Sequence, residues 1–232
     1  MPPTQQRRSP GAGGNSADAD PASTKESDFD IAIRERQQRR ASDQNTYQSS
    51  AIAASLGMIS LAVVATYLRF FLHVAEDGEM PWADIMGTLT LVAGGAIGME
   101  MYAKWAHKAL WHDYAPGWKL HITHHSPRIG LFEDNDVFAV MNAVPAMALC
   151  AYGFVTPNIF GAGCFGAGLG ITLYGIAYMF IHDGMVHRRF PTGPIAEWPM
   201  LKRMAVAHQL HHAGKYEGAP WGMFLGPQPS NG

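Results

Sequence analysis

The 232-residue sequence predicts an all-α membrane protein, with four transmembrane helices and a histidine-rich helical cap on one side of the membrane. Residues 51–181 contain four apolar runs, each close to the ~20 residues that a helix needs to cross a bilayer. Residues 1–46 are polar, so the mean hydropathy of −0.06 averages two unlike regions. Ten of the 11 histidines follow the second and fourth apolar runs, which places them together beyond the membrane.

The N-terminal segment, residues 1–46, is predicted to be a disordered polar tail. It is rich in Pro, Gly, Ser, Asp and Gln and has little apolar surface to bury. Only residues 31–40 have the composition of a short helix. A plastid transit peptide would be poor in acidic residues, and the tail contains Asp18, Asp20, Glu26, Asp28 and Asp30. The tail is therefore a weak match to a transit peptide, and residues 47–228 are predicted to form the membrane domain.

Four membrane spans follow in order, at residues 51–72, 85–102, 137–155 and 159–181. Arg69 lies close enough to the end of the first span to extend its charged group to the membrane surface. Pro145 falls in the middle of the third span, where it removes a backbone donor and predicts a kink.

Glycines in the second and fourth spans predict close helix packing. Gly94-x3-Gly98 and Gly166-x3-Gly170 both repeat a small residue every four positions, a pattern that lets two helices approach closely in a membrane. Residues 161–166 also fit G-x-G-x-x-G. No strand precedes that match and no βαβ unit surrounds it, so a dinucleotide site is not expected.

Charge predicts the orientation in the membrane. With four spans, the tail and both histidine-containing segments lie on one side. Of the 17 Lys and Arg residues, only Arg69 lies at the opposite end, beside an acidic loop with Glu76, Asp77 and Glu79. The positive-inside rule then places the histidines in the cytosol, or in the stroma if the membrane is that of a plastid. The net charge of −2 gives no indication of a nucleic-acid partner.

The histidines form one pattern twice. The first copy is His107-x4-His112 followed by His121-x2-His124-His125, and the second is His182-x4-His187 followed by His208-x2-His211-His212. Only His73 lies outside the two copies. Neutral imidazole is the commonest protein ligand for first-row transition metals. Because ten imidazoles exceed the coordination number of a single ion, the pattern predicts two metal ions.

The spacing within each copy predicts how the rings are directed. Residues at i, i+3 and i+4 share one face of a helix, so each triple can point several nitrogens at one place. The x4 pairs differ, because five residues on a straight α-helix correspond to about 140° of rotation. We therefore expect either that the helix ends between the two rings or that they bind different metals. Asp183, next to His182, is expected either to orient a ligand imidazole or to cap a helix.

An all-nitrogen site for two metals beside a bilayer suits the activation of dioxygen for attack on a lipid C–H bond. Zinc hydrolases need only three protein ligands and a water. Soluble di-iron bundles use Glu and Glu-x-x-His ligands, and no Glu-x-x-His occurs here. Two non-haem iron ions are therefore preferred, with zinc and copper left open.

The segments HKALWH, HITHH, HDGMVHRRFP and AHQLHHAGKYEG resemble the plant and algal β-carotene hydroxylases of the membrane fatty-acid-hydroxylase superfamily. The resemblance covers residues 47–228. The histidine spacing alone is typical of the wider superfamily of hydroxylases, desaturases and ketolases. The flanking residues, HDGMVHRRFPTGPIAEWP and HQLHHAGKYEGAPWGMFLGP, favour the carotenoid branch.

The resemblance implies a non-haem di-iron monooxygenase of the chloroplast membrane. Such an enzyme hydroxylates C3 of β-ionone rings, converting β-carotene to β-cryptoxanthin and then zeaxanthin, with O2 as co-substrate and reduced ferredoxin as electron donor. It implies ten catalytic, metal-binding histidines: His107, His112, His121, His124, His125, His182, His187, His208, His211 and His212. The alternatives are another lipid hydroxylase, a desaturase, a carotenoid ketolase or, outside enzymes, a metal transporter.

Two further sets of residues have two interpretations each. Trp105, Trp111, Trp118 and Phe132 are expected either to line a pocket for the substrate ring or to anchor the protein at the interface. Arg188, Arg189, Lys202 and Arg203 are expected either to steer an acidic ferredoxin or only to set the topology.

Overall fold

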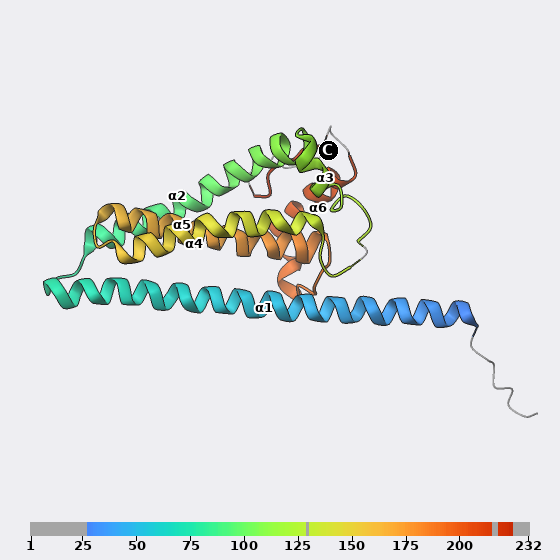
Figure 1. The fold of residues 1–232 in the computed structure, drawn as a ribbon, viewed down its shortest axis with the longest axis horizontal. Helices are drawn as coiled ribbons and strands as arrows, with labels where there is room; N and C mark the ends of the chain where they lie inside the picture. Colours follow the sequence, from blue (N-terminus) through green and yellow to red (C-terminus); the bar gives the residue numbers. More distant parts are fainter. Residues whose placement is uncertain (1–26, 129, 215–217, 225–232) are drawn as a thin grey trace, which may run out of the picture. The chain divides into compact units, whose positions relative to one another are not determined.

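The computed structural model describes residues 27–128, 130–214 and 218–224, and every regular element in those residues is helical (Figure 1). The chain forms two compact units, residues 1–39 and 40–232, and the second unit contains the predicted spans and histidines. The α-helices are α1 Asp28–Asp77, α2 Trp82–Ala106, α3 Ala115–His121, α4 Val137–Val155, α5 Ile159–Met179 and α6 Pro199–His212. Two π-helices, η1 His107–His112 and η3 Phe180–Val186, and two 3-10 turns, η2 Asp134–Asp136 and η4 Pro194–Glu197, lie between them.

Four of these helical segments are long and apolar enough to cross a membrane, which confirms the predicted fold class. They are residues 28–72, 82–112, 134–155 and 159–186, judged by length and composition. The helix α4 coincides with residues 137–155. The helix α5 ends at Met179, and η3 continues the helical segment to Val186, beyond the predicted end at residue 181. The helix α1 begins at Asp28, so it contains residues 31–40 and runs from them into the first span without a break. The disorder predicted for residues 1–46 is therefore wrong for residues 28–46, which are helical. Residues 1–26 of the predicted tail lie outside the described residues.

The helix α5 packs against both α2 and α4 (Figure 1). On its α2 side, a Cβ built on Gly166 would lie 2.2 Å from the carbonyl oxygen of Thr88. One built on Gly170 would lie 2.3 Å from that of Val92. No side chain fits at these distances, so the close packing predicted for this glycine pair is confirmed.

The prediction for the glycine pair of α2 is wrong, because Gly94 and Gly98 do not face a neighbouring helix. A Cβ on Gly98 would meet nothing within 4 Å, and one on Gly94 would meet only Leu91 of the same helix. Gly95, between them in the sequence, does face α5, and a Cβ there would lie 2.7 Å from the carbonyl oxygen of Ala167. Spacing alone could not identify the contact face, because three glycines of α2 lie within five positions.

Arg69 is buried and does not extend to the membrane surface, contrary to expectation. Its side chain is 1% exposed and forms two hydrogen bonds with Asp84 of α2, Nη2 to Oδ1 at 2.8 Å and Nε to Oδ2 at 3.1 Å. It also donates to the carbonyl oxygens of Gly153 and Thr156, at the C-terminal end of α4. These carbonyls lack helical partners, so Arg69 joins α1, α2 and α4 at the end of the spans away from the histidines.

We expect Gly170→Ala to destabilise the protein by about 1–3 kcal/mol, the usual cost of forcing a methyl group into a packed interface. All three nearest atoms are backbone atoms of α2, so the helices must move apart. Thermal unfolding in detergent micelles measures the effect. The matched control is Gly175→Ala on the same helix, where a Cβ would meet nothing within 4 Å. Equal stabilities for the two variants would contradict the packing described.

Candidate metal centre

The two x4 histidine pairs lie at the π-helices that extend α2 and α5. His107 and His112 are the first and last residues of η1, and His182 lies in η3, which His187 directly follows. A π-helix closes i→i+5 hydrogen bonds, so residues five apart lie over each other. The amide of His187 donates to the carbonyl oxygen of His182 at 3.0 Å. The ring centroids of these two residues are 4.7 Å apart, and those of His107 and His112 are 5.1 Å apart. The rings of each pair face the same side, so the expectation that they bind different metals is wrong. The other expectation, a helix end between the two rings, holds only for the second pair, because η3 ends at Val186 whereas η1 contains both His107 and His112.

The two histidine triples lie on different local structures. The helix α3 ends at His121, and His124 and His125 follow in a tight turn whose amides donate to the carbonyls of His121 at 2.9 Å and Ile122 at 3.2 Å. The second triple, His208, His211 and His212, lies on α6. The turn directs His124 away from the other two histidines of its triple.

The ten histidines form two groups that could each hold a metal ion. The ligand atoms within each group all lie within 4.8 Å of one another. The first group is His107, His112, His121, His125 and His211, and the second group is His124, His182, His187, His208 and His212. Each copy of the pattern thus contributes four histidines to one group and the middle residue of its triple to the other.

The two groups are in contact. The rings of His125 and His212, which belong to different groups, have centroids 4.3 Å apart. Within the second group the Nε2 atoms of His124 and His182 are 2.8 Å apart, and those of His187 and His212 are 3.1 Å apart. Two nitrogens that each lie ~2.1 Å from an ion at right angles would be about 3 Å apart. The spacing therefore suits nitrogens that converge on a shared ion.

The other ring nitrogen, Nδ1, has an acceptor in five of these residues. The bonds run from His107 to the Trp221 carbonyl (2.9 Å), His121 to Asn135 Oδ1 (2.6 Å), His124 to Glu133 Oε2 (2.9 Å), His182 to Asp183 Oδ1 (2.8 Å) and His211 to the Gly218 carbonyl. An acceptor at Nδ1 fixes the tautomer and leaves the Nε2 lone pair facing inward, as is usual for metal-binding histidines.

The environment keeps five of the imidazoles outside the membrane spans neutral. Burial lowers the pKa of His121 and His125 to about 3 and that of His212 to about 2, because the imidazolium would lose its hydration. Burial and neighbouring imidazoles also lower the pKa of His124 and His208 well below the usual value. At neutral pH these rings are uncharged and keep a lone pair for a metal.

Two inward nitrogens have no protein partner. Among the described residues, Nε2 of His112 and Nε2 of His211 are buried without a hydrogen bond, and both belong to the first group. A buried polar atom without a partner costs about 1–3 kcal/mol. A bound transition-metal ion would satisfy both atoms, so the residues present fit two ions with nitrogen ligands.

Several neighbours of the histidines were not predicted from the sequence. The ring of Trp221 lies 4.8 Å from that of His112 and 5.2 Å from that of His211, between centroids. The amide of Phe224 donates to Oε1 of Glu100 at 2.9 Å, which attaches this C-terminal segment to α2. Residue spacing could not predict either contact, because both depend on the path of the chain after α6.

The four aromatic candidates divide into two pairs. Trp118 packs against His112 at 5.0 Å between centroids, and Trp111 against His107 at 5.4 Å, so both border the first group. Trp105 and Phe132 are 56% and 70% exposed, in keeping with the interfacial alternative.

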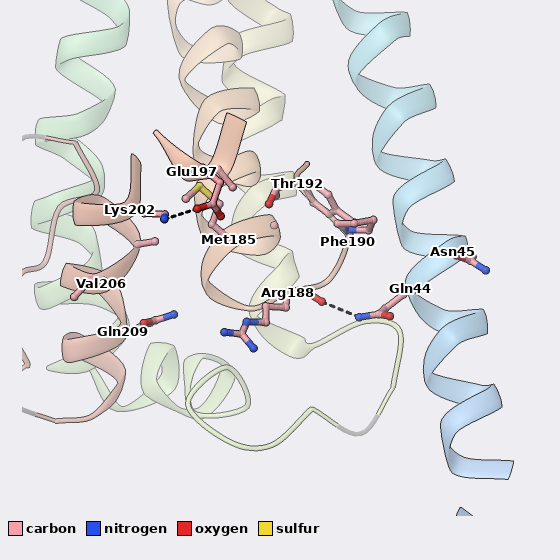
Figure 2. Close-up of a pocket in the computed structure, with 14 residues that line it drawn as sticks. Gln44, Asn45, Met185, Arg188, Phe190, Thr192, Glu197, Lys202, Val206 and Gln209 are labelled. Atoms are coloured by element: carbon pink, nitrogen blue, oxygen red, sulfur yellow. Dashed lines mark hydrogen bonds and ion pairs between the residues drawn. The ribbon is translucent and has the colours of Figure 1, made fainter. Parts of the chain in front are cut away.

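A pocket of about 590 Å³ lies between α1, η3, η4 and α6 (Figure 2). It is lined in part by Gln44, Arg188 and Lys202, and Lys202 pairs with Glu197.

Arg189 is 1% exposed and forms two 2.7 Å bonds to Asp136. A buried, paired guanidinium cannot meet a protein partner, so the steering role considered for Arg189 is wrong.

Each of the two groups contains histidines from both copies of the pattern. Metal content distinguishes this arrangement from one in which each copy binds its own ion. His124→Ala/His182→Ala removes two ligands from one group, so we expect one ion to remain. His121→Ala/His124→Ala removes one ligand from each group and should weaken both ions. Elemental analysis after loading with a divalent metal measures the content. His73→Ala, outside both copies, is the control and should bind two ions. The reverse pattern for the double variants would contradict the grouping.

Comparison with known proteins finds similar proteins that are named as beta-carotene hydroxylases. The chain is 64% identical over 200 residues to the chloroplastic beta-carotene 3-hydroxylase of Haematococcus lacustris, covering 86% of this chain and 62% of the relative. It is 51% identical over 198 residues to chloroplastic beta-carotene 3-hydroxylase 1 of Arabidopsis thaliana, covering 85% and 63%. It is 43% identical over 123 residues to a beta-carotene hydroxylase of Pseudescherichia vulneris, covering 53% and 66%. No solved structure matches the chain.

The chain spans about 62–63% of the length of the algal and plant relatives. The profile of the fatty acid hydroxylase family matches residues 92–227, which include all ten histidines of the two groups. This match covers more than half of the 232 residues. The chain belongs to the fatty acid hydroxylase family.

Proposed function

We propose that this protein is a β-carotene 3-hydroxylase, which adds a hydroxyl group to C3 of a β-ionone ring and converts β-carotene to β-cryptoxanthin and then zeaxanthin. The observation that carries the proposal is the pair of five-histidine groups at the ends of apolar helices. The names of the related proteins favour a carotenoid as substrate. An all-nitrogen pair of sites at the end of membrane helices suits oxidation of a hydrocarbon that enters from the lipid.

The ten histidines are proposed to hold two non-haem iron ions, five residues to each. When bound, the iron pair supplies the binding and reduction of dioxygen. In the overall reaction one oxygen atom replaces hydrogen on C3 as a hydroxyl. The other oxygen atom takes up two electrons and two protons and leaves as water. Two molecules of reduced ferredoxin are the proposed source of those electrons.

The protein's own residues position the metals and the substrate. Acceptors at Nδ1, among them Glu133 and Asp183, hold the histidine rings with Nε2 inward. Trp111 and Trp118 border the first group, and we propose that they contact the substrate ring. A carotenoid is about as long as the ~30 Å hydrocarbon core of a bilayer. Its end ring can therefore reach the histidines while the polyene remains in lipid.

The proposed location is a chloroplast membrane, with the histidine groups in the stroma. The algal and plant relatives are named as chloroplastic proteins. The distribution of Lys and Arg places the histidine side in the compartment that is equivalent to the cytosol. A ferredoxin would be available on that side.

Expression in a bacterial host that makes β-carotene tests the activity. We expect zeaxanthin and β-cryptoxanthin to accumulate, with one 18O per new hydroxyl when the cells are grown under 18O2. Alanine at His124, His182 or His211 should abolish the product, because each substitution removes a ligand nitrogen. The variants should remain in the membrane fraction at wild-type amounts. Hydroxylated pigment from any of the three would contradict the assigned roles.

The same experiment separates the alternatives. A ketolase would give keto-carotenoids, and a fatty-acyl hydroxylase or desaturase would leave the pigments unchanged and alter the lipids. A metal transporter would change cellular metal without any oxygenated product. Transport sites usually lie within the spans near the bilayer midplane, and these histidines lie at and beyond the ends of α2 and α5.

A further inference from the structure

The second group is connected to α1 through a chain of polar contacts that the histidine pattern does not contain. Nδ1 of His182 donates to Oδ1 of Asp183 at 2.8 Å. The other carboxylate oxygen, Oδ2, accepts a hydrogen bond from the hydroxyl of Tyr47 at 2.5 Å. Tyr47 lies on α1, which precedes the segment that matches the family profile.

Arg189 supports the same carboxylate. Its Nη1 lies 3.8 Å from Oδ2 of Asp183, and its guanidinium lies 4.1 Å from the centre of the Tyr47 ring. It also holds Asp136, whose carboxylate accepts from the amide of Glu133 at 3.1 Å. Glu133 in turn accepts from His124, so both carboxylates that orient rings of the second group are held by this set of residues.

The two metal groups therefore have different surroundings. The first group has neutral acceptors at Nδ1, namely two backbone carbonyls and the amide oxygen of Asn135. The second group has two carboxylates, Glu133 and Asp183. A carboxylate acceptor makes an imidazole a stronger donor to a metal than a neutral oxygen does. A hydrogen bond that keeps one of these two carboxylates in place therefore affects the second group and not the first.

We propose that Tyr47 is a positioning residue for the second metal group: its hydroxyl holds the Asp183 carboxylate against His182, and α1 thereby becomes part of the metal centre. This inference rests on the proposed function, since it requires that the histidines bind metal. Gln44, one turn earlier on α1, donates to the carbonyl oxygen of Arg188 at 3.1 Å and holds α1 beside this loop (Figure 2).

Cobalt(II) titration of the metal-free protein in detergent micelles, followed by visible absorption, tests the proposal. Tyr47→Phe keeps the ring and removes the hydroxyl. We expect the affinity for one of the two ions to fall about tenfold, the lower end of the effect of losing a group that orients a metal ligand. The weakened ion should be the one that His182→Ala removes, while the other ion binds as in the wild type.

The matched control is Tyr67→Phe. Tyr67 lies on the same helix, is 62% exposed and stacks on Phe71. Both cobalt affinities should be unchanged in this variant. Asp183→Asn should weaken the same ion as Tyr47→Phe, and the double variant should match Asp183→Asn alone, because the hydroxyl acts only through the carboxylate.

Three results would overturn the positioning role. They are unchanged affinities in Tyr47→Phe, equal weakening of both ions, and additive losses in the double variant. A lower unfolding temperature of metal-free Tyr47→Phe with unchanged affinities would assign the hydroxyl to stability alone. Wild-type protein that binds no cobalt would refute the metal centre itself, whereas two ions bound equally well by wild type and Tyr47→Phe would refute only the role of Tyr47.

Discussion

Ten imidazoles gathered at the end of a membrane bundle impose the main physical constraint on this protein. Six of the ten residues are at most 5% exposed, and the ligand atoms of each group all lie within 4.8 Å of one another. Burial keeps rings such as those of His121 and His208 uncharged, because several imidazolium groups in one buried site would repel each other and lose hydration. Five of the ten rings are also oriented by an acceptor at Nδ1, which residues around the site supply.

The apolar helices place these rings, and their packing explains why two distant copies meet. Glycines of α5 allow it to approach the backbone of α2, and each of these two spans is extended by a π-helix that carries histidines. At the opposite end, Arg69 joins α1, α2 and α4 through buried hydrogen bonds. His107 and His182 are far apart in the sequence, yet the ring of each lies beside that of His208.

The spans and the ten histidines could be predicted because their signals are local. Apolar length predicts a membrane helix, and repeated histidine spacing predicts a metal site. His124 and His211 each belong to the group that is formed mainly by the other copy of the pattern. This could not be predicted, because it depends on the turn after α3 and on the position of α6. The π-helices were not predicted either. A five-residue spacing directs two rings apart on an α-helix but not on a π-helix, and the spacing alone does not distinguish the two helix types. Arg189 resembled a surface charge because Asp136, its partner, is 53 residues away.

Anomalous X-ray diffraction from crystals of the metal-loaded protein tests the central claim most directly, because it locates bound ions without reference to the sequence. The account predicts two metal peaks per chain. One should lie among His107, His112, His121, His125 and His211, and the other among His124, His182, His187, His208 and His212. A single peak, or two peaks with His124 and His211 each bound beside the other histidines of its own triple, would contradict it.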